Sequence, residues 1–360
     1  MLDNILKKYG VSGRFLQEAA LYPDLFIGRI CSQYKDLYKA VTHQGDVSAE
    51  ISGKLRYVAA RLSDFPAVGD FVMLDRSDNE YGNAIIHHVL TRKSSFERKA
   101  VGTENDIQVV AANIDTVFLC MALNNDYNLR RLERYLSIAW DSGAVPVVVL
   151  TKSDLCSNLH NRLSEVSSVA IGADVLATSA MSEEGYKNIQ SYIQPWKTVA
   201  FIGSSGVGKS SLINRLAGRE ILETREIRKD DKGRHATTRR QLLVLPNGGI
   251  VIDTPGMREL GVESVDLSRA FADIDQLAEQ CKFSDCSHQS EPGCAVRRAI
   301  QKGELTDKRL ENYLKLQKEA KYGGLSSKQI ETEKITAMFS SMGGLKNARK
   351  FIKAQSRKKR

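Results

Sequence analysis

The sequence predicts a multidomain α/β protein, and three features of the chain carry that prediction. Short strand-like segments fill residues 25–98, strands then alternate with helices from about residue 109, and the chain after residue 261 is mostly helical around a group of cysteines. Five short strands within about 75 residues are typical of a small closed barrel of the oligonucleotide-binding (OB) type. Alternating strands and helices indicate a parallel sheet with helices on both faces.

The composition is that of a globular protein with an anionic partner. The chain has 360 residues, 42% of them hydrophobic, and a net charge of +9, which favours nucleic acid, although membrane surfaces are also anionic. Apolar runs are far shorter than the roughly 20 residues of a membrane span, and the N-terminus lacks the apolar core of a secretory signal. A cytoplasmic protein without membrane contact is therefore expected.

The barrel is predicted from its strands and turns. Turn-prone stretches such as residues 43–46, 66–70 and 77–83 separate the strands. Residues 1–22 are expected to form a short helical segment that glycines interrupt. The five predicted strands are LFIGRICSQ (25–33), LYKAVT (37–42), AEISGKL (49–55), DFVMLD (70–75) and AIIHHVL (84–90). The strand count alone leaves a generic barrel without a nucleic-acid ligand as an open alternative.

A phosphate-binding loop is predicted at FIGSSGVGKSS, residues 201–211. The spacing G-x-x-x-x-G-K-S lets the backbone turn tightly, so that several N–H groups and a helix N-terminus point at a phosphate. In such a loop Lys209 reaches the β- and γ-phosphates and the Ser210 hydroxyl ligates Mg²⁺. An apolar strand precedes the loop and a helical pattern follows it, as this mechanism requires.

Two segments after the loop carry the remaining phosphate chemistry. VIDTPG places Asp253 at a strand end, where it can hold Mg²⁺, and Gly256 where its N–H can contact the γ-phosphate. The polar stretch GRHATTRR (233–240) suits a switch with a Mg²⁺-binding threonine, either Thr237 or Thr238. Methionine follows DTPG where many small GTPases have a water-orienting glutamine, so slow intrinsic hydrolysis is expected and His235 becomes the candidate catalytic group.

Guanine recognition is predicted before the phosphate loop. VVVLTKSDL places Lys152 and Asp154 after a strand, and ATSAMSEEG places Ser179 and Ala180 after another. An aspartate carboxylate accepts both the N1–H and the N2–H₂ of guanine, which adenine does not offer, so GTP is the expected nucleotide. These elements precede the loop, whereas they follow it in usual GTPases. This order of the motifs indicates a circularly permuted G domain. A fold can accommodate such a permutation, because its natural termini can be joined and a surface loop opened without changing the core.

The predicted site residues form three sets. The nucleotide-binding residues are Thr151, Lys152, Ser153, Asp154, Ser179, Ala180, Gly203, Ser204, Ser205, Gly206, Val207, Gly208, Lys209, Ser210, Ser211, Asp253 and Gly256. The Mg²⁺ ligands are Ser210, Asp253 and either Thr237 or Thr238. The catalytic residues are His235, Lys209 and Thr238.

A zinc site is predicted in CKFSDCSHQSEPGC. Cys281, Cys286, His288 and Cys294 supply three thiolates and one imidazole within a short loop. That set closes a tetrahedral Zn²⁺ site with no position left for water, so the ion would be structural. The other cysteines lie scattered, as in a reduced chain.

The last 15 residues form a basic segment, and it is the last of five regions expected along the chain. Eight of the last 15 residues are basic and none is acidic, which suits salt-dependent binding to RNA phosphates, although such tails are often merely solvated. The expected domains are a helical segment (1–22), the OB-fold barrel (23–100), the permuted G domain (105–262), the zinc-binding helical domain (263–345) and the basic tail (346–360).

The sequence resembles the ribosome small-subunit-dependent GTPase family (RsgA, also called YjeQ or YloQ) over nearly its whole length. The resemblance rests on PAVGD, AANID, GSSGVGKSSLIN, GRHATT, DTPGM and CKFSDCSHQSEPGCAV. It implies an oligonucleotide-binding barrel, a permuted G domain and a zinc domain, in a GTPase that binds the small (30S) ribosomal subunit, is stimulated by it and acts late in its maturation. The expected partners are that subunit and its 16S rRNA, and a monomer is expected. The resemblance also implies that His235 positions the attacking water. The chain departs from the family at Thr151, usually asparagine, which predicts weaker nucleotide affinity, and at Ala236, usually threonine.

Two other classes of function remain open at this stage. The first is an rRNA-binding module whose nucleotide site gates binding, with hydrolysis incidental. The second is a signalling GTPase that a protein partner regulates. A GTPase assay with purified ribosomal subunits distinguishes the three.

Overall fold

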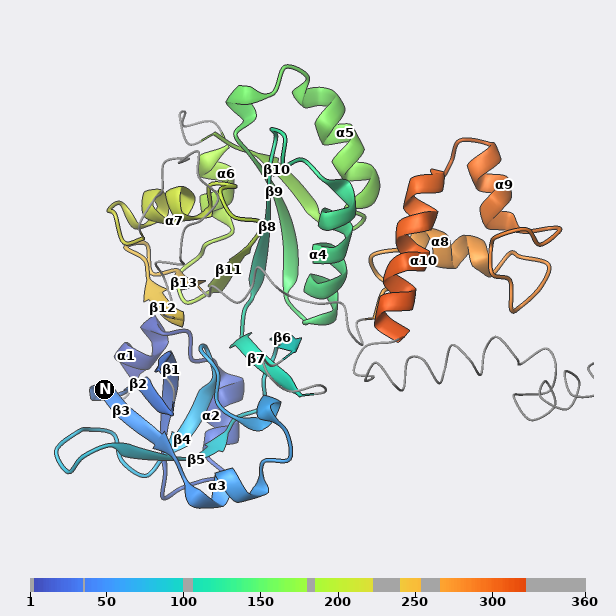
Figure 1. The fold of residues 1–360 in the computed structure, drawn as a ribbon. Coiled ribbons are helices and arrows are strands. Elements are labelled where there is room, and N and C mark those ends of the chain that lie inside the picture. Colours follow the sequence, from blue (N-terminus) through green and yellow to red (C-terminus); the bar gives the residue numbers. More distant parts are fainter. Residues whose placement is uncertain are drawn as a thin grey trace, which may run out of the picture.

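The computed structural model describes residues 3–34, 36–99, 106–179, 185–222, 240–253 and 266–321. An N-terminal barrel, a central sheet with helices and a C-terminal helical unit follow one another along the chain (Figure 1). No helix within these ranges is both long and apolar enough to cross a bilayer.

The N-terminal part is a closed barrel of five strands. The strands are β1 (Phe26–Tyr34), β2 (Leu37–Thr42), β3 (Gly45–Ile51), β4 (Phe71–Leu74) and β5 (Ala84–Val89), preceded by helices α1 (Asp3–Lys8) and α2 (Gly13–Ala19). Around the barrel the order is β1-β2-β3-β5-β4, and β4 pairs back onto β1. Fully buried Ile30, Val47, Val72 and Ile86 fill its interior, so the predicted barrel and its strand count are confirmed.

One predicted strand is wrong at both ends. Strand β3 begins at Gly45, within the predicted turn at residues 43–46, and it ends at Ile51, where helix α3 (Gly53–Val58) follows almost at once. Ser52 caps this helix, because its hydroxyl accepts a hydrogen bond from the Leu55 N–H over 3.0 Å. The serine before Gly53 therefore ends the strand and begins a helix.

A short two-stranded sheet, which the strand pattern did not predict, follows the barrel. Strand β6 (Ser95–Lys99) follows β5 and pairs antiparallel with β7 (Ile107–Ala112). The single helical turn η1 (Leu62–Asp64) lies earlier in the chain, between α3 and β4. Fully buried Phe96 and Val110 join the core of the central part. This pair lies beside the barrel at its junction with the central sheet (Figure 1).

The central part is the predicted parallel sheet. Strands run in the order β10-β9-β8-β11-β13-β12, and all pairs are parallel except β12 with β13. The strands are β8 (Thr116–Ala122), β9 (Val145–Thr151), β10 (Asp174–Ala177), β11 (Thr198–Ile202), β12 (Arg240–Val244) and β13 (Ile250–Asp253). The helices are α4 (Leu129–Asp141), α5 (Leu159–Val169), α6 (Tyr186–Ser191) and α7 (Lys209–Ala217).

Helices cover both faces of this sheet, as expected. Alternate residues of β8 take opposite sides, so that Leu119 packs with α4 and α5 while Phe118 packs with α6 and α7. The two helix pairs lie on opposite sides of the strands in Figure 1. Because the strands are parallel, their carboxyl ends, and the loops that follow them, gather at one edge.

The barrel and the central sheet are joined by backbone pairing. Strand β12 pairs antiparallel with β1 through Ser32 with Gln241 and Gln33 with Arg240, which makes one continuous sheet of 11 strands. Buried Arg29 reinforces the junction, because its guanidinium donates to Thr198 Oγ1 of β11 over 2.9 Å. The barrel therefore contacts the strand that leads into the phosphate loop.

The C-terminal unit packs against α4. It consists of α8 (Ala272–Ala278), α9 (Ala295–Gln301) and α10 (Asp307–Lys321). Arg309 of α10 forms an ion pair with Glu133 of α4 at 2.6 Å, and both side chains are nearly fully buried. The predicted cysteine site lies between α8 and α9.

Candidate functional site

The predicted phosphate loop connects β11 to α7, at the carboxyl edge of the sheet. Gly206 and Gly208 have φ of 78° and 97°, in the left-handed region that glycine adopts without strain. At Gly203 any side chain would place its Cβ 2.5 Å from the Cys120 carbonyl oxygen of neighbouring β8. The glycines of the motif are thus required by the turn and by its close contact with the sheet.

Lys209 begins α7 and folds back over the loop. Its ammonium group donates to the carbonyl oxygens of Gly203 and Ser204, each over 2.7 Å. Ser210 and Ser211 stand in the first turn of the same helix, while Ser205 is exposed at the tip of the loop. The ammonium and the hydroxyl predicted to contact phosphate and Mg²⁺ therefore lie on one short segment.

The predicted guanine-reading segments come to the same edge of the sheet. Thr151 ends β9, and its hydroxyl donates to the Val207 carbonyl of the phosphate loop over 2.6 Å. Lys152 takes the left-handed conformation with φ 57°, which turns the chain into the single turn η2 (Ser153–Leu155). There the Asp154 carboxylate accepts a hydrogen bond from the Ser179 hydroxyl.

Arg215 of α7 links these segments further. Its guanidinium donates to the Ser179 carbonyl over 3.3 Å and lies 4.4 Å from the centre of the Tyr186 ring. Sequence reasoning missed this residue because it belongs to no motif and acts from the end of a helix. Its contact holds the segment after β10 against the helix that follows the phosphate loop.

Asp253 ends β13, the strand beside β11, so it too stands at this edge. Ala180, His235, Thr237, Thr238 and Gly256 lie outside the described residues, as do residues 346–360. Of the predicted nucleotide site, the structure brings together the phosphate loop, Thr151 to Asp154, Ser179 and the end of β13.

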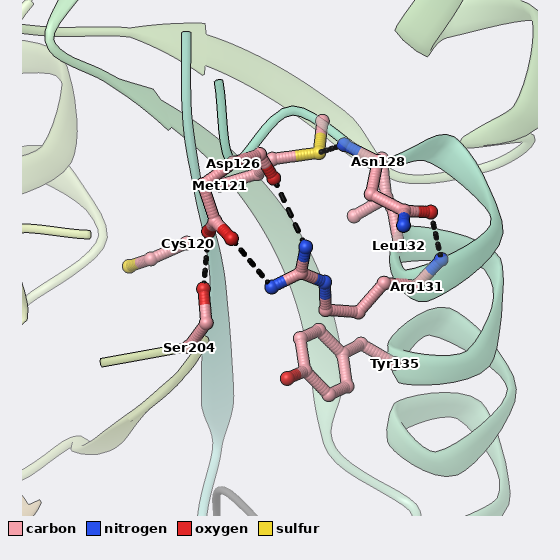
Figure 2. Close-up of a pocket in the computed structure, with 8 residues that line it drawn as sticks. All are labelled: Cys120, Met121, Asp126, Asn128, Arg131, Leu132, Tyr135 and Ser204. Carbon is pink, nitrogen blue, oxygen red and sulfur yellow. Dashed lines mark hydrogen bonds and ion pairs between the residues drawn. The ribbon is translucent and has the colours of Figure 1, made fainter. Parts of the chain in front are cut away.

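Sequence reasoning also missed Asp126, which contacts the phosphate loop from α4's side. Figure 2 shows its carboxylate between the Ser204 hydroxyl, from which it accepts a hydrogen bond, and the Arg131 guanidinium, 2.9 Å away. These residues line a small pocket between β8, α4 and the loop. No motif marks Asp126; its one local signal is its place two residues before Asn128, the N-cap of α4.

The four predicted zinc ligands converge. The Sγ atoms of Cys281, Cys286 and Cys294 and a ring nitrogen of His288 all lie within 4.8 Å of one another. Cys281 Sγ lies 3.9 Å from Cys294 Sγ, and His288 Nδ1 lies 3.5 Å from Cys294 Sγ. Tetrahedral ligands at Zn–S of about 2.3 Å and Zn–N of about 2.0 Å stand roughly 3.5–3.8 Å apart, so the donor set fits Zn²⁺.

The surroundings of the cluster favour bound thiolates. The Ala295 N–H donates to Cys281 Sγ over 3.3 Å, and the Arg297 N–H donates to Cys294 Sγ over 3.4 Å at the start of α9. Burial lowers the pKa of His288, which keeps the imidazole neutral for a metal. Glu291 ties the loop between the ligands, because its carboxylate accepts from the Ser287 and Gln289 N–H groups.

Comparison with known proteins agrees with this geometry. Residues 89–263 match the family model described as RsgA GTPase. The chain is 50% identical over 346 residues to Small ribosomal subunit biogenesis GTPase RsgA 2 of Lactiplantibacillus plantarum, covering 96% of this chain and 97% of the relative. It is 41% identical to Small ribosomal subunit biogenesis GTPase RsgA of Methanosarcina acetivorans, covering 92% and 89%.

Solved structures show the same architecture. The crystal structure of YjeQ from Thermotoga maritima has a TM-score of 0.60 at 27% identity and covers 81% of this chain and 97% of that one. YloQ, described as a circularly permuted GTPase, has a TM-score of 0.58 at 24% identity, covering 82% and 95%. With this likeness of sequence and fold over most of its length, the chain belongs to the RsgA family of circularly permuted GTPases.

Proposed function

We propose that the protein binds GTP with Mg²⁺ at residues 203–211 and hydrolyses it on the small ribosomal subunit, acting late in that subunit's maturation. The observation that carries this proposal is the meeting of Lys209, Thr151 to Asp154 and Asp253 at the carboxyl edge of one parallel sheet. The relatives' names point to small-subunit biogenesis.

The phosphate half of the site is built for a polyphosphate. The backbone N–H groups of the loop and the start of α7 supply partial positive charge, and Lys209 supplies a full one. The ammonium has three N–H donors, so from its place over the Gly203 and Ser204 carbonyls it can also donate to phosphate oxygens. Ser210 and Asp253 are the proposed Mg²⁺ partners, with Thr237 or Thr238, and the Gly256 N–H would contact the γ-phosphate.

The guanine half depends on Asp154. Its carboxylate, oriented by the Ser179 hydroxyl, is the proposed acceptor of the two guanine N–H donors. The stem of Lys152 covers the base, and the Ala180 N–H would meet the guanine oxygen. This division gives base selectivity to Asp154 and binding strength to the phosphate loop.

Zn²⁺ at Cys281, Cys286, His288 and Cys294 has a structural role in this proposal. The cluster supplies four ligands and leaves no position for a substrate, so the ion orders the loop between α8 and α9. The C-terminal unit thereby keeps the shape in which it packs against α4.

The proposed partner is the 16S rRNA of the small subunit, bound by a monomer. A net charge of +9 and the barrel support RNA contact, and the basic segment at residues 346–360 would add salt-dependent affinity. Because DTPG is followed by methionine, hydrolysis depends on His235 as the proposed water-positioning group and is expected to be slow without the subunit.

The test is GTP hydrolysis measured with and without purified subunits. A large rise with 30S and little with 50S subunits supports the proposal. Lys209→Ala abolishes activity if the loop is the phosphate site, and His235→Ala removes the stimulated rate if that histidine acts on water. A His235→Ala variant that keeps both nucleotide-dependent 30S binding and the cellular role would instead indicate an rRNA-binding module. Stimulation by a protein, with none by ribosomes, would indicate a signalling GTPase.

A further inference from the structure

Asp126 contacts the phosphate loop from outside every motif that the nucleotide site uses. It lies in the turn between β8 and α4, where its N–H donates to the Asn124 side chain over 3.0 Å. Its carboxylate faces the loop, with one oxygen toward Ser204 and the other toward Arg131 of α4. Figure 2 shows this alignment of the three side chains.

Ser204 is the residue through which Asp126 reaches the phosphate-binding lysine. The Ser204 hydroxyl donates to Asp126, while the Ser204 carbonyl accepts from the Lys209 ammonium over 2.7 Å. The side chain of Ser204 is thus held by the Asp126 carboxylate, and its backbone carbonyl contacts the Lys209 ammonium. A change at Asp126 is transmitted to Lys209 through a single residue.

Arg131 makes this arrangement possible beside a site for anions. A lone carboxylate next to the loop would repel a polyphosphate, but the Arg131 guanidinium pairs with Asp126 at 2.9 Å and also donates to its backbone carbonyl over 3.1 Å. A second bond fixes the turn where it enters α4, because Asn128 caps the helix by accepting from the Arg131 backbone N–H over 3.0 Å. The carboxylate is therefore held rigidly, with its charge balanced.

We propose that Asp126 is a positioning residue for GTP hydrolysis, which holds Ser204 so that the loop presents Lys209 to the phosphates. The inference rests on the proposed phosphate site at residues 203–211. Its chemistry is orientation: the charge-assisted hydrogen bond that the Asp126 carboxylate accepts, in the turn before α4, limits the conformations of a glycine-rich loop.

The test is a double-mutant cycle on the full-length chain. Asp126→Ala lowers kcat/KM for GTP about tenfold, the effect of losing one charge-assisted hydrogen bond that orients a binding group. Asp126→Asn, whose amide oxygen still accepts from a hydroxyl, retains most of the activity. In a Ser204→Ala background, Asp126→Ala has no further effect on kcat/KM, because the contact is already absent.

Controls separate positioning from folding and from failure of the proposed site. Asp174→Asn, which alters the Asp174–Tyr192 hydrogen bond of 2.6 Å elsewhere in the same sheet, leaves kcat/KM unchanged. Thermal unfolding identifies variants that have merely lost structure, and Ser204→Ala probes the same bond from its other end. Equal activity of Asp126→Ala and the parent, or strictly additive effects, overturns the inference. Activity that survives Lys209→Ala overturns the phosphate site itself.

Discussion

The hydroxyl of Thr151 donates a hydrogen bond to the backbone carbonyl of Val207, over 2.6 Å. Thr151 ends β9 and is 5% exposed, whereas Val207 lies in the loop predicted to hold phosphate. The bond therefore joins the proposed guanine-reading segment to the predicted phosphate loop. The resemblance to RsgA GTPases implies asparagine at this position, and here a threonine hydroxyl supplies the donor.

Thr151→Val should weaken GTP binding about fivefold, because it removes one buried hydrogen bond of about 1 kcal/mol without changing side-chain volume. Titration with a fluorescent guanine nucleotide measures this. Thr151→Ser, which keeps the donor, is the matched control and should bind nearly as the parent does. The preference for guanine over adenine should persist in both, since Asp154 is untouched; equal affinity in parent and Thr151→Val would contradict the role given to this bond.

Metal analysis should find about one Zn²⁺ per chain, bound at the cysteine cluster. Cys294→Ser should lose the ion and lower the thermal midpoint of the C-terminal unit, because a closed structural site contributes directly to folding. Cys156→Ser is the control, since Cys156 lies outside the cluster and is only half-buried. Full zinc content in Cys294→Ser would rule out the proposed ligand set.

Local sequence patterns predicted the elements that build the site. Glycines at fixed spacing predicted the phosphate loop, because the loop requires residues without a side chain. Gly203 is an example, since a Cβ there would collide with the Cys120 carbonyl oxygen. Continuous apolar runs predicted strands that are buried on both faces, as Phe118 and Leu119 show. The helix that begins after Ser52 was missed because a cap of one residue is a weaker signal than the strand before it.

Contacts between distant segments could not be predicted in this way. The pairing of Ser32 with Gln241 makes one sheet of the barrel and the central part, yet neither strand carries a sign of its partner. No motif marks Asp126 either, because its proposed role depends on Ser204, 78 positions away. Such contacts depend on how finished elements pack, which period and spacing do not encode.

The junction between barrel and sheet should be sensitive to acid through Asp115. Burial raises the pKa of this carboxyl, but the Lys93 ammonium at 2.7 Å and the Thr198 N–H outweigh it and hold the pKa below its ordinary value of 3.8. Because the folded-state pKa is lowered, the ionised carboxylate stabilises the fold at every pH above the ordinary pKa of 3.8. This stabilisation is lost as the pH falls through the lowered pKa of the folded state.

Asp115→Asn should therefore unfold at lower urea concentration at neutral pH and lose less stability than the parent on acidification. The control is Asp46→Asn, which breaks an ion pair of the same 2.7 Å length between side chains that are about half exposed. Exposed pairs contribute little, so its urea midpoint should follow the parent's at every pH. Parallel pH profiles for Asp115→Asn and the parent would show that the junction does not depend on this carboxylate.

A buried ion pair holds the C-terminal unit to α4, and its loss should separate the two. The side chains of Arg309 and Glu133 are 6% and 4% exposed and lie 2.6 Å apart, and Arg309 also pairs with Asp273 of α8 at 2.8 Å. Arg309→Ala leaves Glu133 buried without its cation, and breaking a buried pair from one side costs about 3 kcal/mol or more. Burial already raises the pKa of Glu133 against the pull of Arg309, so the unpaired carboxyl should take up a proton.

The sharpest comparison is with Arg130→Ala at the same contact. Arg130 pairs with Glu311 at 2.9 Å, but these side chains are 51% and 65% exposed, so the change should cost less than about 0.5 kcal/mol. Urea unfolding gives the cost of each variant, and small-angle scattering should show a larger radius of gyration for Arg309→Ala alone. If both arginine variants unfolded at the same urea concentration, apolar packing of α10, and not its buried charge, would hold the C-terminal unit in place.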